Sequence, residues 1–288
     1  PDDHSIAKPR SFCPSCRTPI AWWDNLPILS YALLNGRCRA CRVRIPFRYP
    51  MVEALTGAVF ALLAWRHLAD PVRYPPAVTA VLAAFAVCLV ITTFIDIDYR
   101  IIPYPLSLGI TALAIPLCVL LPGLQTEIWP PWSAAPPPSR LEAGFASLAG
   151  IVAGAGLIDL MGLVGMGYLW VKQTLKRSSF GPALERSGLT RWLVTGPSDP
   201  LKDVVVGGGD LNLMTAVGGL LGWKAALLVT LFLAPLVGSL VGVVYLMSTK
   251  DHYIAYGPFL ALAAFLVMLW RNEILAWFAS GLVRIPAS

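Results

Sequence analysis

The chain has 288 residues, of which 57% are hydrophobic and 13% are charged, and its formal net charge is +6. An ordinary water-soluble domain contains about 25% charged residues, so this composition excludes that class. In lipid every backbone polar group must be satisfied within the protein, and long apolar runs therefore form helices. We expect an all-α polytopic membrane protein in which the basic excess sets the topology and no nucleic acid is bound.

The first 50 residues are polar, basic and rich in proline and cysteine. This segment is too short to build a large core, so it needs an internal cross-link. Two Cys-x-x-Cys pairs offer one, and their members are Cys13, Cys16, Cys38 and Cys41. Each pair can occupy two corners of a tetrahedron, and four thiolates without a histidine indicate a closed, structural Zn²⁺ site. The alternative, two disulfides, needs an oxidising compartment.

Apolar runs follow, and we expect about seven transmembrane helices, at residues 52–68, 75–97, 105–121, 143–171, 211–223, 225–247 and 258–278. Most of these runs are near the roughly 20 residues that a spanning helix needs. The run 211–223 is short, so it must borrow length from the glycines ahead of it or enter the membrane only in part. The run 143–171 is long and rich in glycine, so it can tilt or kink.

Basic side chains gather in residues 1–50 and 172–203, whereas residues 122–142 contain Arg140 alone. If the helices alternate in direction, both basic segments lie on one face, and the positive-inside rule makes that face cytoplasmic. We therefore expect two domains. Residues 1–50 form a cytoplasmic four-cysteine zinc-binding module, and residues 51–288 form a transmembrane domain.

Acidic residues stand at the ends of two apolar runs on that same face. Asp96 and Asp98 lie in the stretch TFIDIDYR, and Asp210 lies in VGGGDLNL. An ionised carboxylate inside a bilayer costs about 2.5–3.5 kcal/mol on insertion scales, so such residues are functional candidates. Two neighbouring carboxylates share one proton, so one can act as a base on water while the other donates to a peptide carbonyl. We predict that Asp96 and Asp210 form a catalytic pair with Asp98 in support.

Three glycines, Gly207, Gly208 and Gly209, precede Asp210. Because glycine has no side chain, these residues let the backbone leave helical geometry and let another chain approach closely. We assign them a supporting role beside an extended substrate segment.

Other interpretations of the acidic residues stay open. Asp96 can be a helix-end carboxylate that reaches water. Asp159 lies deep in the run 143–171, where we favour a structural polar contact. With Asp96 and Asp210 it would instead form a proton or cation path in an ion-coupled transporter. A zinc-binding membrane scaffold without catalysis is a further alternative. Glu53 either caps a helix start or contacts the cysteine module.

The chain contains, in this order, CPSC, WWDNLPILSY, GRCRAC, FRYPMVEALTG, FIDIDYRIIP, GGGD and YGPFLAL. Together these motifs resemble the type IV prepilin peptidases, which are membrane aspartic proteases of the GxGD kind. The resemblance covers nearly the whole chain and implies that Asp96 and Asp210 are catalytic. It implies a multi-pass protein of the bacterial inner membrane, in contact with membrane lipids and with its active site facing the cytoplasm.

The resemblance also implies the substrates and the second activity. Type IV prepilins and type II secretion pseudopilins would lose their basic leader peptide, and S-adenosylmethionine would methylate the new N-terminus. Methylation is linked in the family to the cysteine region. The alternative is a peptidase whose zinc module is only structural, because no Rossmann-type nucleotide fingerprint is present.

The sequence departs from the family pattern at three places. A membrane helix usually precedes the cysteine module, and we expect that one precedes residue 1. Tyr104 stands where an acid is usual, and Asn212 stands where lysine is usual. We hypothesise that these two changes compensate each other, which activity measurements on a charge-restoring double substitution would test. The sequence does not define the oligomeric state.

Overall fold

The computed structural model describes residues 11–68, 75–125, 138–178, 182, 207–249 and 255–282. Within these ranges the chain is helical, and its only β-type pairing is two isolated bridges, Phe12 with Pro19 and Arg37 with Arg44. The chain forms two compact units, Pro1–Ala69 and Asp70–Ser288. The all-α prediction is therefore confirmed for the described residues.

The first unit contains a loop region and one long helix. A 3-10 turn, η1 (Trp22–Asn25), and a short helix, α1 (Leu29–Leu33), precede α2 (Arg48–Leu68). The Glu53 carboxylate accepts the backbone N–H of Ile28 at 2.8 Å. Glu53 therefore ties α2 to the loop region, as one of its two interpretations proposed, and it lies beyond the first turn of α2.

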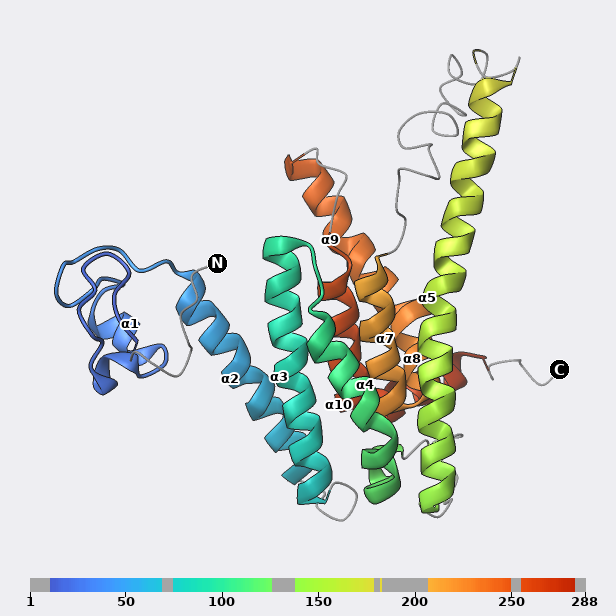
Figure 1. Ribbon diagram of the computed structural model, residues 1–288, viewed down its shortest axis with the longest axis horizontal. Coiled ribbons are helices and arrows are strands. Elements are labelled where there is room, and N and C mark those ends of the chain that lie inside the picture. The colour runs from blue at the N-terminus through green and yellow to red at the C-terminus, as the bar shows by residue number, and fades with distance from the viewer. Residues whose placement is uncertain are drawn as a thin grey trace. The chain divides into compact units, whose positions relative to one another are not determined.

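The second unit is a helical assembly that Figure 1 shows with its labels. Its elements are α3 (Pro76–Tyr99), α4 (Tyr104–Leu120), η2 (Pro122–Gln125), α5 (Arg140–Arg177), α7 (Gly208–Leu221), α8 (Trp223–Leu227), η4 (Leu228–Leu233), α9 (Ala234–Thr249) and α10 (Gly257–Leu282). A π-helical turn, η4, joins α8 to α9 without a break. Helix α10 is kinked at Trp270, whose backbone is not helical.

Helix α7 is the core of this unit. It packs against α4, α5 and α10, and every residue from Leu213 to Leu221 is buried. A helix that is apolar all round is stable only when neighbours cover all its faces. The closest approach is to α5, where a Cβ on Gly150 would collide with the carbonyl of Gly218. Midway along α7, the hydroxyls of Thr111 and Thr215 lie 3.0 Å apart and form a hydrogen bond to α4.

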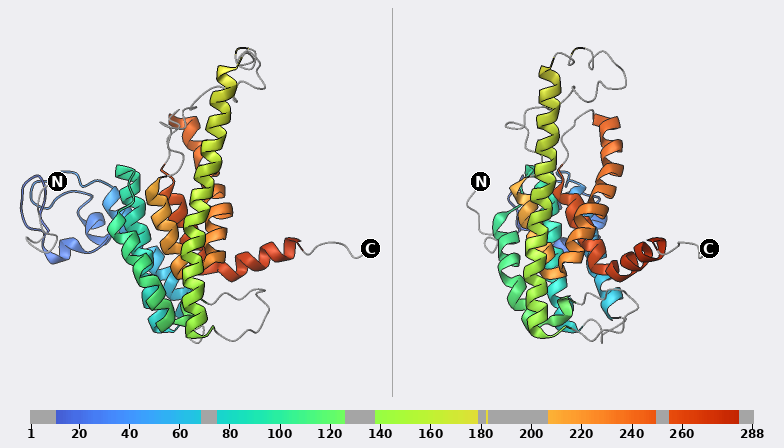
Figure 2. Two further views of the ribbon diagram at one scale, coloured as in Figure 1. Left: turned by 45° about the vertical axis from the view of Figure 1, so that its right-hand side comes forward. Right: turned by 90° about the vertical axis from the view of Figure 1, so that its right-hand side faces the viewer.

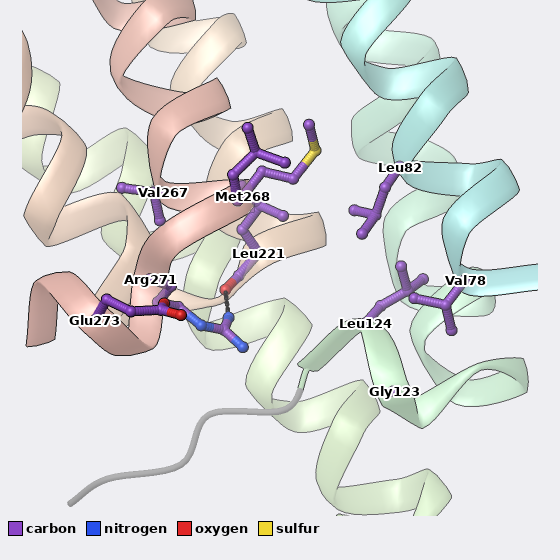
Figure 3. A pocket seen from close by; sticks show the side chains of 10 residues that line it. Val78, Leu82, Gly123, Leu124, Leu221, Val267, Met268, Arg271 and Glu273 are labelled. Atoms are coloured by element: carbon purple, nitrogen blue, oxygen red, sulfur yellow. Dashed lines mark hydrogen bonds between the residues drawn. The ribbon is translucent and has the colours of Figure 1, made fainter. Parts of the chain in front are cut away.

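The end of α7 that is remote from Asp210 is closed by side-chain donors. Arg271 of α10 donates to the carbonyl of Leu221 at 2.9 Å, as Figure 3 shows. Beside this bond lies a small cavity of about 30 Å³, lined by apolar residues such as Val78, Leu82 and Leu124 and by the charged residues Arg271 and Glu273. Because Val78 lies near the start of α3 and Asp96 near its end, this cavity is separate from Asp96.

Each of the seven predicted runs overlaps a helix. Helices long and apolar enough to cross a membrane number four in the described ranges: Arg48–Leu68, Pro76–Tyr99, Arg140–Arg177 and Trp223–Gly242. Apolar helices Tyr104–Leu120 and Gly257–Arg271 are shorter, and α7 has 14 residues. The membrane-protein class is supported, whereas the count of seven spans is not established.

Helix α5 is much longer than a bilayer requires. Its 38 residues correspond to about 57 Å of helix, against a hydrocarbon thickness of about 30 Å. Figure 2 shows one end of α5 extending past the other helices of this unit. A capping box between Ser139 and Glu142 fixes where α5 begins, because each group satisfies a backbone N–H that the helix leaves free.

Candidate active site

Asp96 lies in the last turn of α3 and is only 6% exposed. The C-terminal end of a helix carries partial negative charge, which disfavours a carboxylate. Another helix offsets this effect, because the backbone N–H of Gly257, the first residue of α10, donates to the Asp96 carboxylate. The positive end of α10 therefore holds the carboxylate of Asp96. Helix α3 ends at Tyr99, and the next residue, Arg100, has a left-handed backbone conformation with φ 55°.

Asp210 is the third residue of α7. Its carboxylate accepts the backbone N–H of Gly207 at 3.3 Å, which is half of a capping box. The carboxylates of Asp210 and Asp96 are near enough to repel each other. The structure thus brings together the two predicted aspartates: Asp210 lies in the first turn of α7, and Asp96, at the end of α3, lies against the N-terminal end of α10. Asp98 is exposed and lies on another face of α3, since two residues advance a helix by about 200°.

The three glycines act differently from the prediction. Gly207 is extended, with φ −77° and ψ 146°, whereas Gly208 and Gly209 form the first turn of α7. The prediction of non-helical backbone is therefore right for Gly207 and wrong for the other two. Gly208 and Gly209 instead allow other residues to approach the backbone closely. A Cβ on Gly209 would lie 2.8 Å from Cβ of Ile102, and one on Gly208 would lie 3.2 Å from the Tyr104 hydroxyl. The segment between α3 and α4 packs directly on the start of α7.

Two residues of the site were not assigned from the sequence. A Cβ on Gly257 would lie 2.5 Å from Oδ2 of Asp96, so only glycine leaves the carboxylate its place. The Tyr256 hydroxyl interacts electrostatically with Asp210. A signal was present, because Tyr-Gly-Pro opens the apolar run 258–278, and proline in the first turn marks a helix start. Nothing in the sequence connected that helix start to Asp96.

The depth predicted for Asp159 needs correction. Gly150 of α5 faces Gly218 of α7, and Gly154 faces Met214. Residue numbers rise along α5 as the numbers of the facing residues fall along α7, so the two helices are antiparallel. A further step of four residues along each helix places residue 158 beside Asp210. Asp159 therefore lies level with Asp210 and is exposed. The proton or cation path of the transporter alternative therefore loses the one acidic residue that was expected deep in the membrane.

The four predicted metal ligands come together in the first unit. The Sγ atoms of Cys13, Cys16, Cys38 and Cys41 all lie within 4.8 Å of one another. The Sγ atoms of Cys13 and Cys41 are 3.8 Å apart, and a tetrahedron with Zn–S bonds of about 2.3 Å has edges of about 3.8 Å. All six cysteines are free. The spacing fits four ligands of one metal ion and is too long for a disulfide.

The backbone around the cysteines repeats the same turn twice. Arg17 follows Cys16 with φ 55°, and Arg42 follows Cys41 with φ 59°. In each turn the arginine N–H donates to the carbonyl of the first cysteine, at 2.8 Å to Cys13 and 3.0 Å to Cys38. Each turn thus supplies two of the four thiols of the cluster, the number that a closed tetrahedral site needs.

Hydrogen bonds favour the thiolate form at two of the four cysteines. The Thr18 hydroxyl and backbone lower the pKa of Cys16 to about 6. Backbone N–H groups of Cys41 and Ala40 lower the pKa of Cys38. At Cys41 the backbone hydrogen bond with Val43 acts in the same direction, but burial and hydrogen bonds with the other three cysteines outweigh it and raise the pKa to about 11. Thiolates are the metal-binding form of cysteine, so the donor set and the surroundings of Cys16 and Cys38 fit Zn²⁺.

The fold and the two sites define a class: a helical membrane protein with two neighbouring carboxylates, one of them buried, and a four-cysteine cluster that could hold a metal ion. The family described as Bacterial Peptidase A24 N-terminal domain matches residues 1–67. A protein of Neisseria gonorrhoeae is 30% identical, with 98% of this chain and 81% of the relative aligned, and one of Aeromonas hydrophila is 32% identical with the same coverage. One of Legionella pneumophila is 27% identical over 94% of this chain and 75% of the relative. Each relative is named prepilin leader peptidase/N-methyltransferase.

The chain belongs to the prepilin leader peptidase/N-methyltransferase family of enzymes. The resemblance found in its motifs is thereby confirmed. Comparison with solved structures gave no match.

Proposed function

We propose that the chain is a membrane aspartic endopeptidase that removes the basic leader peptide of type IV prepilins and type II secretion pseudopilins. The observation that carries this proposal is the meeting of Asp96 and Asp210, from helices distant in sequence, at the N-terminal ends of α10 and α7. Two carboxylates held this close share one proton, which supplies a base and an acid side by side.

The pair hydrolyses a peptide bond without a covalent intermediate. The ionised carboxylate takes a proton from water as the water oxygen attacks the scissile carbonyl carbon. The protonated carboxyl gives its proton to the carbonyl oxygen, which forms a tetrahedral diol. The C–N bond then breaks as the first carboxyl gives its proton to the amine nitrogen and a diol hydroxyl gives its proton to the second carboxylate, which restores the starting protonation of the pair. The products are the leader, with a new C-terminal carboxyl group, and the mature pilin, with a free amine.

The proposal includes an orientation and a membrane. The aspartates and the cysteine module face the cytoplasm of the bacterial inner membrane, because the basic segments favour that side. A basic leader stays at that face, and the apolar segment that follows it lies in lipid against the helices. In this proposal the chain has seven membrane spans, one of which is α7, and the scissile bond lies near Asp96 and Asp210.

We propose that Cys13, Cys16, Cys38 and Cys41 hold a structural Zn²⁺ in the module of residues 1–50, ahead of the peptidase domain of residues 51–288. The metal cross-links two turns of a segment that has little core of its own. S-adenosylmethionine would supply the methyl group for the new N-terminus, and we assign no residues to it. The second candidate is a peptidase with a structural zinc module and no methyltransferase activity, which the closed four-sulfur site favours.

Cleavage of a purified prepilin by the full-length enzyme in lipid tests this function. Asp96→Asn and Asp210→Asn should each reduce cleavage at least about 10³-fold, because the proton cannot be shared. Asp159→Asn, exposed and outside the pair, is the matched control and should retain most activity. Product mass with and without S-adenosylmethionine separates the two candidates. Cleavage that survives either Asn variant would contradict the peptidase assignment and favour transport.

Metal content tests the zinc site. Wild-type protein should contain about one zinc per chain, and Cys38→Ser should lose it together with thermal stability of the first unit. Cys88→Ser, in α3, is the control and should retain the metal. Equal zinc in both variants, measured by atomic emission, would show that the ion is bound elsewhere.

A further inference from the structure

We propose that Tyr256 is a further catalytic residue, whose hydroxyl donates a hydrogen bond to the oxygen of the scissile carbonyl. The inference rests on the proposed peptidase function and adds a group to its site. Its starting point is a buried polar atom: the Tyr256 hydroxyl is shielded from solvent and has no hydrogen-bond partner within the part of the chain that the structure describes. Nearly all buried polar atoms in proteins are paired, so an unpaired one needs an explanation.

The position of this hydroxyl supplies the explanation. Tyr256 precedes Gly257, whose backbone N–H donates to the Asp96 carboxylate. The Tyr256 hydroxyl itself interacts electrostatically with Asp210. Consecutive residues of one chain segment thus reach both members of the pair. We place the substrate carbonyl between Asp96 and Asp210, where it can accept a hydrogen bond from the Tyr256 hydroxyl.

Neighbouring residues of α9 and α10 restrict the Tyr256 ring. Its centroid lies 6.4 Å from that of Phe259, at an interplanar angle of 59°. A Cβ on Gly238 of α9 would lie 3.8 Å from Cε2 of Tyr256 and 3.4 Å from Cδ2 of Phe259. The backbone carbonyl of Tyr256 accepts the N–H groups of Phe259 and Leu260, at 3.0 and 3.3 Å. A donor held in place before the substrate arrives needs no reorganisation during the reaction.

Peptide hydrolysis benefits from a hydrogen-bond donor at the scissile carbonyl oxygen. During attack by water the electron pair of the C=O bond moves onto oxygen, which receives a proton from the acidic carboxyl. A hydrogen bond from the Tyr256 hydroxyl strengthens as negative charge grows on that oxygen. The tyrosine keeps its own proton throughout, so the proton balance of the aspartate mechanism is unchanged. The bond is stronger in the transition state than in the ground state, so it raises kcat.

Tyr256→Phe tests the proposal, since it removes the hydroxyl and leaves the ring. Steady-state cleavage of prepilin by the full-length enzyme in lipid should show kcat reduced about 10²-fold, the usual effect of losing one such donor. KM should stay near the wild-type value, because ground-state binding does not use this bond. Thermal unfolding should occur at the wild-type temperature or above it, because an unpaired buried hydroxyl costs stability. Tyr168→Phe, on exposed α5 surface, is the matched control and should match wild type.

The outcomes separate the inference from the function on which it rests. Wild-type cleavage with an unchanged kcat for Tyr256→Phe would overturn the role of Tyr256 and leave the peptidase intact. A reduced kcat accompanied by a lower unfolding temperature would show a structural role and would also overturn it. Failure of the wild-type enzyme, while an established relative cleaves the same prepilin, would overturn the peptidase function itself.

Discussion

The two ends of α7 are built in opposite ways. At the end that begins with Gly208, the helix carries Asp210, and the glycines leave room for the segment after α3. We call this the aspartate end. At the other, anchored end, side chains from three elements satisfy the last carbonyls: Ser147 and Gln125 donate to Gly219 at 2.8 Å each, and Arg271 donates to Leu221. A left-handed Gly222, with φ 90°, then ends the helix.

This difference separates stability from chemistry along a single helix. Two of the donors at the anchored end, Gln125 and Ser147, are buried, so losing one leaves a buried carbonyl less well paired. The aspartate end instead holds two carboxylates close together, which destabilises the folded state when both are charged, and we propose that this end carries out catalysis. Substitutions at the anchored end should therefore reduce stability with little effect on turnover per folded molecule. Substitutions at the aspartate end should do the reverse.

Gly218→Ala should have the largest effect. The added Cβ would collide with the carbonyl of Gly150 on α5, so the helices must separate, at a cost of about 3 kcal/mol. Thermal unfolding in detergent should show a clearly lower midpoint, while cleavage per folded molecule stays near wild type. Gly156→Ala, also on a helix but with open space at its Cβ, is the control and should be neutral or slightly stabilising. Equal midpoints for the two variants would contradict the close packing of α5 and α7.

Gly257→Ala should have the next largest effect, at the aspartate end. Its Cβ would lie 2.5 Å from Oδ2 of Asp96, so the carboxylate must move. A displacement of about 1 Å in a catalytic group can cost about 10²-fold in rate, equivalent to about 2.7 kcal/mol of activation energy. Because a side-chain end can yield, the unfolding midpoint should change little.

The control for Gly257→Ala is Gly109→Ala on α4, where an added Cβ meets nothing within 4 Å. Kinetics of prepilin cleavage and thermal unfolding should be measured on both variants. Full activity of Gly257→Ala would show that the Asp96 carboxylate does not need its observed position.

Ser147→Ala should have the smallest effect and refines the anchored end. It removes one of the donors to the Gly219 carbonyl while Gln125 still bonds to it, so we expect a loss of about 1 kcal/mol. Ser239→Ala removes an exposed hydroxyl that bonds only within its own helix and should change nothing measurable. The free energies of unfolding of the two variants should be measured in denaturant. Equal stability of Ser147→Ala and Ser239→Ala would contradict the role of Ser147 at the anchored end.

Local patterns carried much of the prediction. The apolar runs located the helices, although the single run 225–247 became α8, η4 and α9 with a π-helical turn. The Cys-x-x-Cys spacing located the cluster, because each turn is formed by neighbouring residues. The cost of carboxylates near lipid marked Asp96 and Asp210 as candidate functional residues. In each case the relevant forces act within a short stretch of chain.

Contacts between distant segments could not be inferred in this way. The sequence pattern of Gly208 and Gly209 suggested an extended backbone, but the helix dipole and the packing of Ile102 favour a first helical turn. Asp159 was placed too deep, because its level depends on the register between α5 and α7. That register is set by the fit of Gly150 against Gly218, and no single stretch of sequence encodes it.

The sequence by itself determined the membrane class, the helical segments, the four thiols and the identity of the acidic residues. Hydropathy and ligand spacing are properties of short stretches, so they can be inferred without a fold. Only the tertiary structure brought Tyr256 and Gly257 to Asp96 and Asp210, and only it placed Gln125, Ser147 and Arg271 at the end of α7. These groups act through hydrogen bonds across helices, and such partners are chosen when the helices pack.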